Sequence, residues 1–279
     1  MIPAVKNHPR SFEDNRYVYP VVSRRSRGIS IGINMNPDKF CNFDCVYCQV
    51  DRTTPGIAPD IDVAILEVEL RAMLDLYQSG QLQEHPIFKE TSRSLLHLND
   101  VALSGDGEPT ICKNFTQVCE CVNRVRREPW CPKFKLVLIT NATGLHRPEV
   151  QRGLEFFSDK DEIWAKLDAG TDDYFQKIDR TGLKLEPILN NLLMEGRKRP
   201  VIIQSLFLEY QGQGPDDAEI RAYLDRLAWL QRQGCRIQLV QVYSIARPPA
   251  ESAAKPLGKE RLEAIAARVR ALGLEAEVY

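Results

Sequence analysis

The 279-residue sequence lacks the features that would place it in several common protein classes. It contains no apolar run long enough to span a bilayer, so we expect no membrane-spanning helix. Its polar, charged N-terminus has no apolar stretch of the signal-peptide type. The formal net charge of −1 does not predict binding to nucleic acid or to a membrane surface. These absences predict a cytoplasmic protein without a membrane partner.

Histidine is also scarce, whereas cysteine is not. The four histidines, at positions 8, 85, 97 and 146, are scattered and show no spacing typical of metal ligands. In a reducing compartment, cysteines are expected to be metal ligands or buried thiols rather than disulfides. The eight cysteines are Cys41, Cys45, Cys48, Cys112, Cys119, Cys121, Cys131 and Cys235.

Short β-branched runs alternate with stretches of helical periodicity from residue 29 onward, which predicts repeated βα units and a parallel sheet. Strands are expected at 29–35, 101–105, 134–140, 162–168, 201–207 and 236–243, with a possible last strand at 274–279. Helices are expected near 62–78, 113–127, 148–156, 185–196, 216–231 and 259–271. No internal linker rich in Gly, Pro or Ser is present. We therefore predict an N-terminal extension over residues 1–28 and one α/β domain over residues 29–279.

Six βα units suit either an open doubly wound sheet or a partial barrel. Polar residues occupy alternate positions near several strand ends: Asn34, Lys166, Asp168, Gln204, Gln241 and Tyr243. In a doubly wound sheet both faces meet helices, whereas alternate positions of a barrel face a lumen that can hold a polar ligand. The pattern therefore favours a partial (β/α)6 barrel of the TIM type.

The loop after the first predicted strand contains three cysteines in eight positions, with the spacing C-x3-C-x2-C over Cys41, Cys45 and Cys48. Sites in parallel α/β folds assemble at the carboxyl ends of the strands. Three thiolates can hold an iron–sulfur cluster by three of its irons and leave the fourth iron open. The alternatives are a zinc knuckle with a distant fourth ligand or three core cysteines. A zinc site would usually show a second cysteine or histidine pair, and none is obvious.

A second candidate loop follows the second predicted strand and reads "SGDGEPT". Gly105 and Gly107 permit unusual backbone dihedrals and a close approach to a ligand, and Glu108 adds a carboxylate at the end of the strand. Taken alone, the segment is equally well a glycine-rich turn. Its position after the second strand favours a binding loop.

The motif C-x3-C-x-Φ-C, where Φ is aromatic, resembles the signature of the radical S-adenosylmethionine (radical SAM) superfamily. The three cysteines and Tyr47 match it. The resemblance implies a six-unit partial barrel with a 4Fe–4S cluster held by Cys41, Cys45 and Cys48. It also implies S-adenosylmethionine on the open iron, with Tyr47 lying against the adenine and the segment Gly105–Asp106–Gly107–Glu108 contacting the methionine amino group. The insertion of Asp106 leaves open which group meets the amine.

Three segments look like the branch that contains the tRNA 4-demethylwyosine synthases of wybutosine synthesis: "GINMNPDKFCNFDCVYCQ", "LSGDGEPT" and "VQVYSIARPPAE". The archaeal members of that branch carry further N-terminal cysteines for a second cluster. Residues 1–40 here contain no cysteine. The resemblance therefore carries over the core chemistry but not the reaction of that branch.

Further candidate residues lie at or after the predicted strand ends. The two-residue period of a strand places Lys166 and Asp168 on one face, where they are expected to pair and to bind cofactor or act on substrate; a structural ion pair is the alternative. Arg180 is a candidate clamp for an anion, or else a surface arginine. The predicted catalytic set is Lys166, Asp168 and Arg180. The predicted cofactor-binding set is Phe43, Tyr47, Gly105, Asp106, Gly107, Glu108, Asn141, Lys166, Asp168, Gln204 and Tyr243.

Other polar positions and the remaining cysteines allow weaker interpretations. Asn141 is equally well an Asx turn, and Arg247 is an anchor candidate for an anionic substrate. Cys112, Cys119, Cys121 and Cys131 are expected to be inert thiols rather than a second cluster, because Cys119 and Cys121 point to different faces of one helix. Cys235 is expected to be structural.

The resemblance implies that the reduced cluster cleaves S-adenosylmethionine to a 5′-deoxyadenosyl radical, which abstracts hydrogen from a substrate. The implied cofactors are the 4Fe–4S cluster and S-adenosylmethionine, and a reductant such as flavodoxin or ferredoxin is an implied partner. The substrate class stays open between a small molecule, a peptide and a tRNA base. A redox module that only holds a cluster is the alternative outside the enzyme class.

Overall fold

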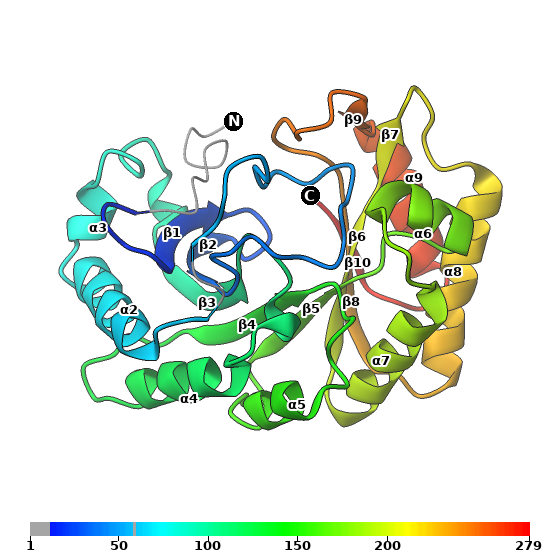
Figure 1. The fold of residues 1–279 in the computed structure, drawn as a ribbon. Helices are drawn as coiled ribbons and strands as arrows, with labels where there is room; N and C mark the ends of the chain where they lie inside the picture. Colours follow the sequence, from blue (N-terminus) through cyan, green and yellow to red (C-terminus); the bar gives the residue numbers. More distant parts are fainter. Residues whose placement is uncertain (1–11, 58–59) are drawn as a thin grey trace. The chain divides into compact units, whose positions relative to one another are not determined.

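The computed structural model describes residues 12–57 and 60–279, and it divides the chain into two compact units (Figure 1). The first unit comprises Met1–Cys41, Thr54–Ile139 and Arg147–Glu162. The second unit comprises Asn42–Thr53, Thr140–His146 and Ile163–Tyr279. Among the described residues, no helix combines the length and apolarity needed to cross a membrane.

In the first unit, strands follow the order β1-β2-β3-β4, with β1 antiparallel to β2 and the others parallel. Their bounds are β1 Val18–Ser23, β2 Gly28–Asn34, β3 Leu98–Ser104 and β4 Lys135–Thr140. Every residue of β2 is buried, as expected for a strand covered on both faces. The parallel pairing of β2 with β3 brings Asn34 opposite Ser104, so the loops after these strands begin side by side.

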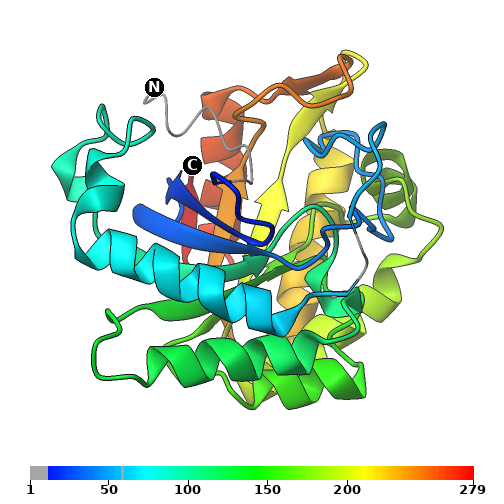
Figure 2. The same ribbon diagram turned by 60° about the vertical axis from the view of Figure 1, so that its left-hand side comes forward.

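The helices of the first unit are α2 (Val63–Gln78), α3 (Gln81–Glu84), α4 (Phe115–Arg126) and α5 (Pro148–Leu154), with 3-10 turns at Arg93–Leu95 and Pro109–Ile111. Asp62 caps α2, because its carboxylate accepts hydrogen bonds from the amides of Ala64 and Ile65. Helix α4 packs beside α2 and α5, as Figure 2 shows.

In the second unit, β5 (Glu162–Lys166), β6 (Val201–Leu206), β8 (Ile237–Tyr243) and β10 (Ala276–Val278) form a parallel series. The short strands β7 (Leu208–Tyr210) and β9 (Ala254–Pro256) form an antiparallel pair. The helices are α6 (Asp172–Asp179), α7 (Leu185–Lys198), α8 (Asp217–Arg232) and α9 (Lys259–Arg270). The register aligns Lys166, Gln204, Gln241 and Glu277 in one row across the strands.

The predicted α/β class and all the predicted strands and helices are confirmed, including the last strand. The elements that were not predicted are β1, β7, β9, α6, the one-turn helix α3 and the two 3-10 turns. Strand β1 lies within residues 1–28, and its Pro20 is tolerated because an edge strand needs fewer paired amides. Strands β7 and β9 have three residues each, and α6 has eight, which is too short for a clear helical period. The boundary between extension and domain stays a prediction.

Gly170 lies directly after β5 and fits closely against α8. A Cβ atom at this position would lie 2.0 Å from the backbone nitrogen of Tyr223. Because backbone atoms of a helix cannot move aside cheaply, we expect Gly170→Ala to lower the free energy of unfolding by about 3 kcal/mol. Urea unfolding measures this loss. Gly182→Ala is the matched control, because a Cβ there would meet no atom within 4 Å. Equal midpoints for the two variants would contradict the packing.

Candidate active site

The three motif cysteines lie in the loop that follows β2. Cys41 ends a segment of the first unit, whereas Cys45 and Cys48 belong to the second. None of the three forms a disulfide, and all are partly exposed. Within the described ranges, no three His, Cys, Asp or Glu side chains converge as ligands of a single metal ion. That search addresses one ion, whereas each cysteine of a 4Fe–4S cluster binds a different iron.

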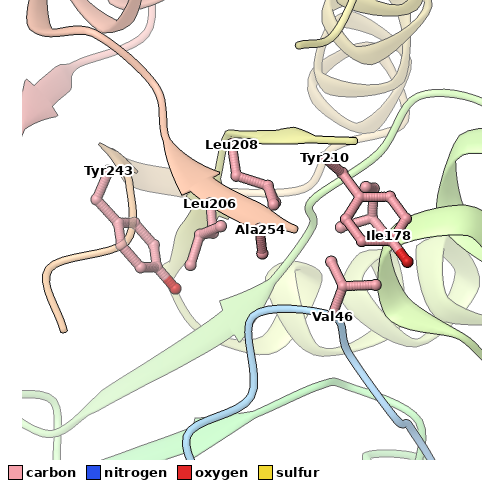
Figure 3. Close-up of a cluster of buried hydrophobic side chains, with 7 residues drawn as sticks. All are labelled: Val46, Ile178, Leu206, Leu208, Tyr210, Tyr243 and Ala254. Atoms are coloured by element: carbon pink, nitrogen blue, oxygen red, sulfur yellow. The ribbon is translucent and has the colours of Figure 1, made fainter. Parts of the chain in front are cut away.

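Val46 anchors the cysteine loop in an apolar cluster of the second unit. The cluster comprises Val46, Ile178, Leu206, Leu208, Tyr210, Tyr243 and Ala254, and Figure 3 shows Val46 close to Ile178 of α6. Val46 is fully buried while its neighbours Cys45 and Tyr47 are only partly buried. Val46 therefore holds the loop to the fold by apolar packing. The side chains of Cys45 and Tyr47, on either side of it, can make polar contacts.

Tyr47 contacts a buried charged group at the end of β5. Its hydroxyl donates to Asp168 Oδ2 and lies 3.0 Å from Asp179 Oδ1. Lys166 Nζ lies 3.3 Å from Asp168 Oδ2 and 4.6 Å from the centroid of the Tyr47 ring. The predicted pairing of Lys166 with Asp168 is therefore confirmed. Asp168 also accepts a hydrogen bond from the amide of Leu206 at 2.7 Å, which fixes its carboxylate.

Burial and neighbouring charges shift the pKa values of this group. Burial, followed by repulsion from Asp168, raises the pKa of Asp179 to about 7, and Lys166 acts in the opposite direction. Burial and the same two carboxylates raise the pKa of Tyr47. Burial is the largest influence on the pKa of Lys166 and acts to lower it, but attraction to Asp168, Tyr243, Cys45 and Asp179 together outweighs burial and raises the pKa overall. The Tyr47 phenol and the Lys166 ammonium therefore keep their protons at neutral pH.

Gln204 and Tyr243 extend the polar row from Lys166. Gln204 Nε2 donates to Gln241 Oε1 at 2.7 Å, and both side chains are buried. Lys166 Nζ donates to the Tyr243 hydroxyl at 3.2 Å. The predicted polar positions on β5, β6 and β8 thus form one connected row, because alternate residues share a face and the strands are in parallel register.

Asn141 and Phe43 place the beginning of the cysteine loop. Asn141 Oδ1 accepts from the Thr143 amide at 3.0 Å, which is an Asx turn, while its Nδ2 donates to Asn42 Oδ1 at 2.9 Å. The Asx-turn interpretation of Asn141 is therefore confirmed, and its contact with cofactor or substrate stays a prediction. Phe43 is buried and packs edge-on against Phe175 of α6, with ring centroids 5.4 Å apart. A small cavity is lined by polar Asn141, Lys166, Asp168 and Asp179 and by apolar Phe43, Leu167, Phe175, Leu185 and Ile188.

In the first unit, the glycine loop packs against the chain segment that leads to Cys41. Asn34 Nδ2 donates to Asp106 Oδ2 at 2.8 Å, and the Asp106 amide donates back to Asn34 Oδ1 at 3.0 Å. Gly105 has φ +134°, and a Cβ on Gly107 would lie 1.8 Å from the carbonyl oxygen of Phe40. Both positions therefore require glycine.

Glu108 differs from the expectation of a freely presented carboxylate. Its side chain is buried, and its Oε1 accepts from the amide and the hydroxyl of Thr110, at 3.0 and 2.6 Å. Glu108 thereby caps the 3-10 turn Pro109–Ile111. Asp106 is the less buried acid of this loop.

Arg180 is already paired in the structure. It ends α6 with φ 45°, in the left-handed region, and its guanidinium donates to Glu251 at 2.9 Å and to the Tyr210 hydroxyl at 2.8 Å. A substrate anion would have to displace Glu251. The carbonyl of Arg247 accepts a hydrogen bond from the Gln49 side chain at 3.0 Å, so the loop after β8 contacts the cysteine loop.

The other cysteines match the expectation of inert thiols. Cys112, Cys119, Cys121 and Cys235 are buried and Cys131 is partly buried, and all are free. Burial raises the pKa of Cys112, Cys121, Cys131 and Cys235 to about 11. Such thiols are poor nucleophiles at neutral pH.

Asp179 is the main site residue that the sequence analysis missed. It lies at the end of α6, an element that was not predicted, and its side chain is almost completely buried. The only available signal was an acidic residue next to Arg180 in "KIDRTG". Its contacts with the cysteine loop come from residues more than 130 positions apart, as the Cys45–Asp179 and Tyr47–Asp179 separations show.

The chain is similar in sequence to curated proteins and similar in fold to solved structures. No protein-family model matches the chain. A UPF0026 protein of Methanocaldococcus jannaschii is 31% identical over 193 residues, which are 68% of this chain and 53% of that protein. The chain therefore spans little more than half of that curated relative.

Two solved structures have similar folds. A radical SAM methyltransferase from Sphaerobacter thermophilus superimposes with a TM-score of 0.60 and 15% identity, covering 94% of this chain and 68% of that one. TYW1 with a lysine–pyruvate adduct bound gives a TM-score of 0.58 and 17% identity, covering 88% of this chain and 74% of that one. The predicted fold is thereby confirmed: the chain has the partial-barrel fold found in these radical SAM proteins.

Proposed function

We propose that the chain is a radical S-adenosylmethionine enzyme. The observation that carries the proposal is the C-x3-C-x-Φ-C loop, which begins at the carboxyl end of β2 in a chain with this fold. In parallel α/β folds that end of the strands is where cofactors bind. A redox module that only holds a cluster is disfavoured, because a glycine loop with the acidic Asp106 follows β3, beside the start of the cysteine loop.

The residues present fit a 4Fe–4S cluster. Cys41, Cys45 and Cys48 supply three partly exposed thiols, none in a disulfide, within one loop, and no fourth cysteine lies near them in the sequence. Three ligands leave one iron for another molecule. The bound cluster would supply the electron that cleaves S-adenosylmethionine to methionine and a 5′-deoxyadenosyl radical.

The chain itself would bind and orient the cofactor. We assign the adenine contact to Tyr47, whose ring is fixed through its hydroxyl, with Phe43 and Asn141 holding the same loop. Gly105, Asp106, Gly107 and Glu108 are assigned to the methionine end. Because Glu108 caps its own turn, we favour Asp106 and the loop carbonyl oxygens as the groups that accept hydrogen bonds from the amine.

The polar row of the second unit is assigned to the ribose or to the substrate. Lys166 is paired with Asp168 and Tyr243, and Gln204 is paired with Gln241, so their donors and acceptors are held in fixed positions. Such a preorganised row costs little reorganisation when a ligand binds. An electron donor such as flavodoxin or ferredoxin would reduce the cluster, and the substrate would be a small molecule, a peptide or a tRNA base.

The proposal predicts that the protein makes 5′-deoxyadenosine. After anaerobic reconstitution with iron and sulfide, the protein is mixed with dithionite and S-adenosylmethionine, and the products are separated by liquid chromatography. We expect 5′-deoxyadenosine to accumulate with time, and to be absent when dithionite or the cluster is omitted. A fully reconstituted protein that forms no 5′-deoxyadenosine would refute the proposal. Deuterium transfer from candidate substrates into this product then identifies the substrate class.

A further inference from the structure

The last turn of α6 holds the cysteine loop through its backbone. The amide of Val46 donates to the carbonyl of Ile178 at 2.9 Å, and the amide of Asp44 donates to the carbonyl of Asp179 at 3.2 Å. The last carbonyls of a helix lack partners within the helix. Arg180 stops α6 by taking a left-handed conformation, so these carbonyls are left for the loop.

The side chain of Asp179 adds two further contacts to the same loop. Cys45 Sγ donates to Asp179 Oδ1 at 3.2 Å, and the Tyr47 hydroxyl lies 3.0 Å from the same oxygen. A cysteine and a tyrosine two positions apart thus meet at one carboxylate oxygen. The other oxygen, Oδ2, is buried and has no hydrogen-bond partner among the described residues.

Burial of the Asp179 carboxylate costs free energy, which is unexpected for a residue that only stabilises the fold. The residue is 1% exposed, and Asp168 lies near enough to repel its charge. An isolated buried carboxylate is costly, and an apolar side chain could fill such a position more cheaply. The contacts that Asp179 makes in return go to a motif cysteine and to the motif tyrosine rather than to the core.

We propose that Asp179 is a positioning residue for the cluster, acting through Cys45 and Tyr47. The inference rests on the proposed function. The carboxylate fixes the second cysteine and the adenine-facing ring at one point, so that both are placed before the cluster and S-adenosylmethionine bind. When iron binds the Cys45 sulfur, the thiol proton is released to solvent, and the contact to Tyr47 continues to hold the loop. Residues that contact a metal ligand without binding the metal themselves commonly tune the affinity for the metal and its reduction potential in this way.

The test compares Asp179→Ala and Asp179→Asn with Asp173→Ala. Asp173 is an exposed aspartate in the first turn of the same helix and is the matched control. Each protein is reconstituted anaerobically at limiting iron. Bound iron and sulfide, the electron paramagnetic resonance spectrum of the reduced cluster and its midpoint potential are measured, and circular dichroism reports folding.

We expect Asp179→Ala to bind iron about 10-fold more weakly than the wild type, at the lower end of the range for lost outer partners of a metal site, and so to retain less iron at limiting supply. Asp179→Asn should retain wild-type iron, because its amide oxygen still accepts from the Cys45 thiol and still contacts the Tyr47 hydroxyl before iron binds. Its midpoint potential should rise, because a negative charge beside the Cys45 sulfur is removed and an N–H donor is added. A merely structural residue would leave the potential unchanged.

The two proposals fail in different ways. If the wild type assembles a cluster and Asp179→Ala assembles the same cluster with the same potential, the inference about Asp179 is wrong. It is equally wrong if Asp173→Ala reproduces the loss, or if the potential of Asp179→Asn equals that of the wild type. If Asp179→Ala does not fold, the Asp179→Asn potential decides alone. If the wild type assembles no cluster, the proposed function is overturned, and the inference falls with it.

Discussion

Replacement of Cys45 by alanine is expected to abolish the reductive cleavage of S-adenosylmethionine. The variant loses one of three thiolates, and with it an iron that no other motif residue can bind. Loss of a residue that only supports a metal ligand typically costs 10- to 100-fold in affinity or activity, so loss of a ligand should cost more than about 100-fold. We expect 5′-deoxyadenosine to fall to the level found without cluster, and bound iron to fall with it.

Cys131→Ala is the matched control for Cys45→Ala. Cys131 is also a free, partly exposed thiol, but it follows α4 in the first unit and lies outside the motif. This variant should keep wild-type iron and wild-type 5′-deoxyadenosine. Full activity in Cys45→Ala would exclude Cys45 as a ligand, and equal losses in both variants would mean that the thiols stabilise the fold rather than the cluster.

The motif cysteines were identifiable from the sequence because their signal is local. Cys41, Cys45 and Cys48 lie within one loop, so spacing alone indicates a shared ligand. The row formed by Lys166, Gln204 and Gln241 was also predictable, since alternate residues of a strand share a face and parallel strands align their ends. The first inference needs only the spacing of the cysteines, and the second needs only the period of a strand and the parallel direction of the strands.

The contacts of Asp179 and Glu108 could not be predicted from spacing or periodicity. Asp179 depends on a two-turn helix whose stop is set by the left-handed Arg180, and its contacts join residues far apart in sequence. Glu108 was expected to face a ligand, but Thr110 lies two residues away and satisfies its carboxylate. In both cases the outcome is decided by which hydrogen-bond partner is nearest in space, and no periodicity encodes that.

Lys166→Met should destabilise the cluster-free protein by about 4 kcal/mol, because breaking a buried ion pair leaves its partner charged and uncompensated. The Lys166 ammonium is 3.3 Å from Asp168 Oδ2, whose side chain is 1% exposed. Asp179 lies in the same buried group, so removal of the cation leaves two carboxylates near each other. Urea unfolding measures the loss. Lys177→Met is the matched control on exposed α6 surface and should change stability by less than about 0.5 kcal/mol.

A second substitution separates the charge effect of Lys166 from lost packing. Asp168→Asn keeps an oxygen that accepts from the Leu206 amide and removes one negative charge. If the cost of Lys166→Met arises from uncompensated charge, the double variant Lys166→Met/Asp168→Asn should be less destabilised than the sum of the single variants. We expect a difference of at least about 1 kcal/mol, within the range for residues in one network. Strict additivity would mean that Lys166 stabilises the fold through other contacts, such as those of its ammonium with the Tyr47 and Tyr243 rings, and that its charge is not what holds Asp168 in place.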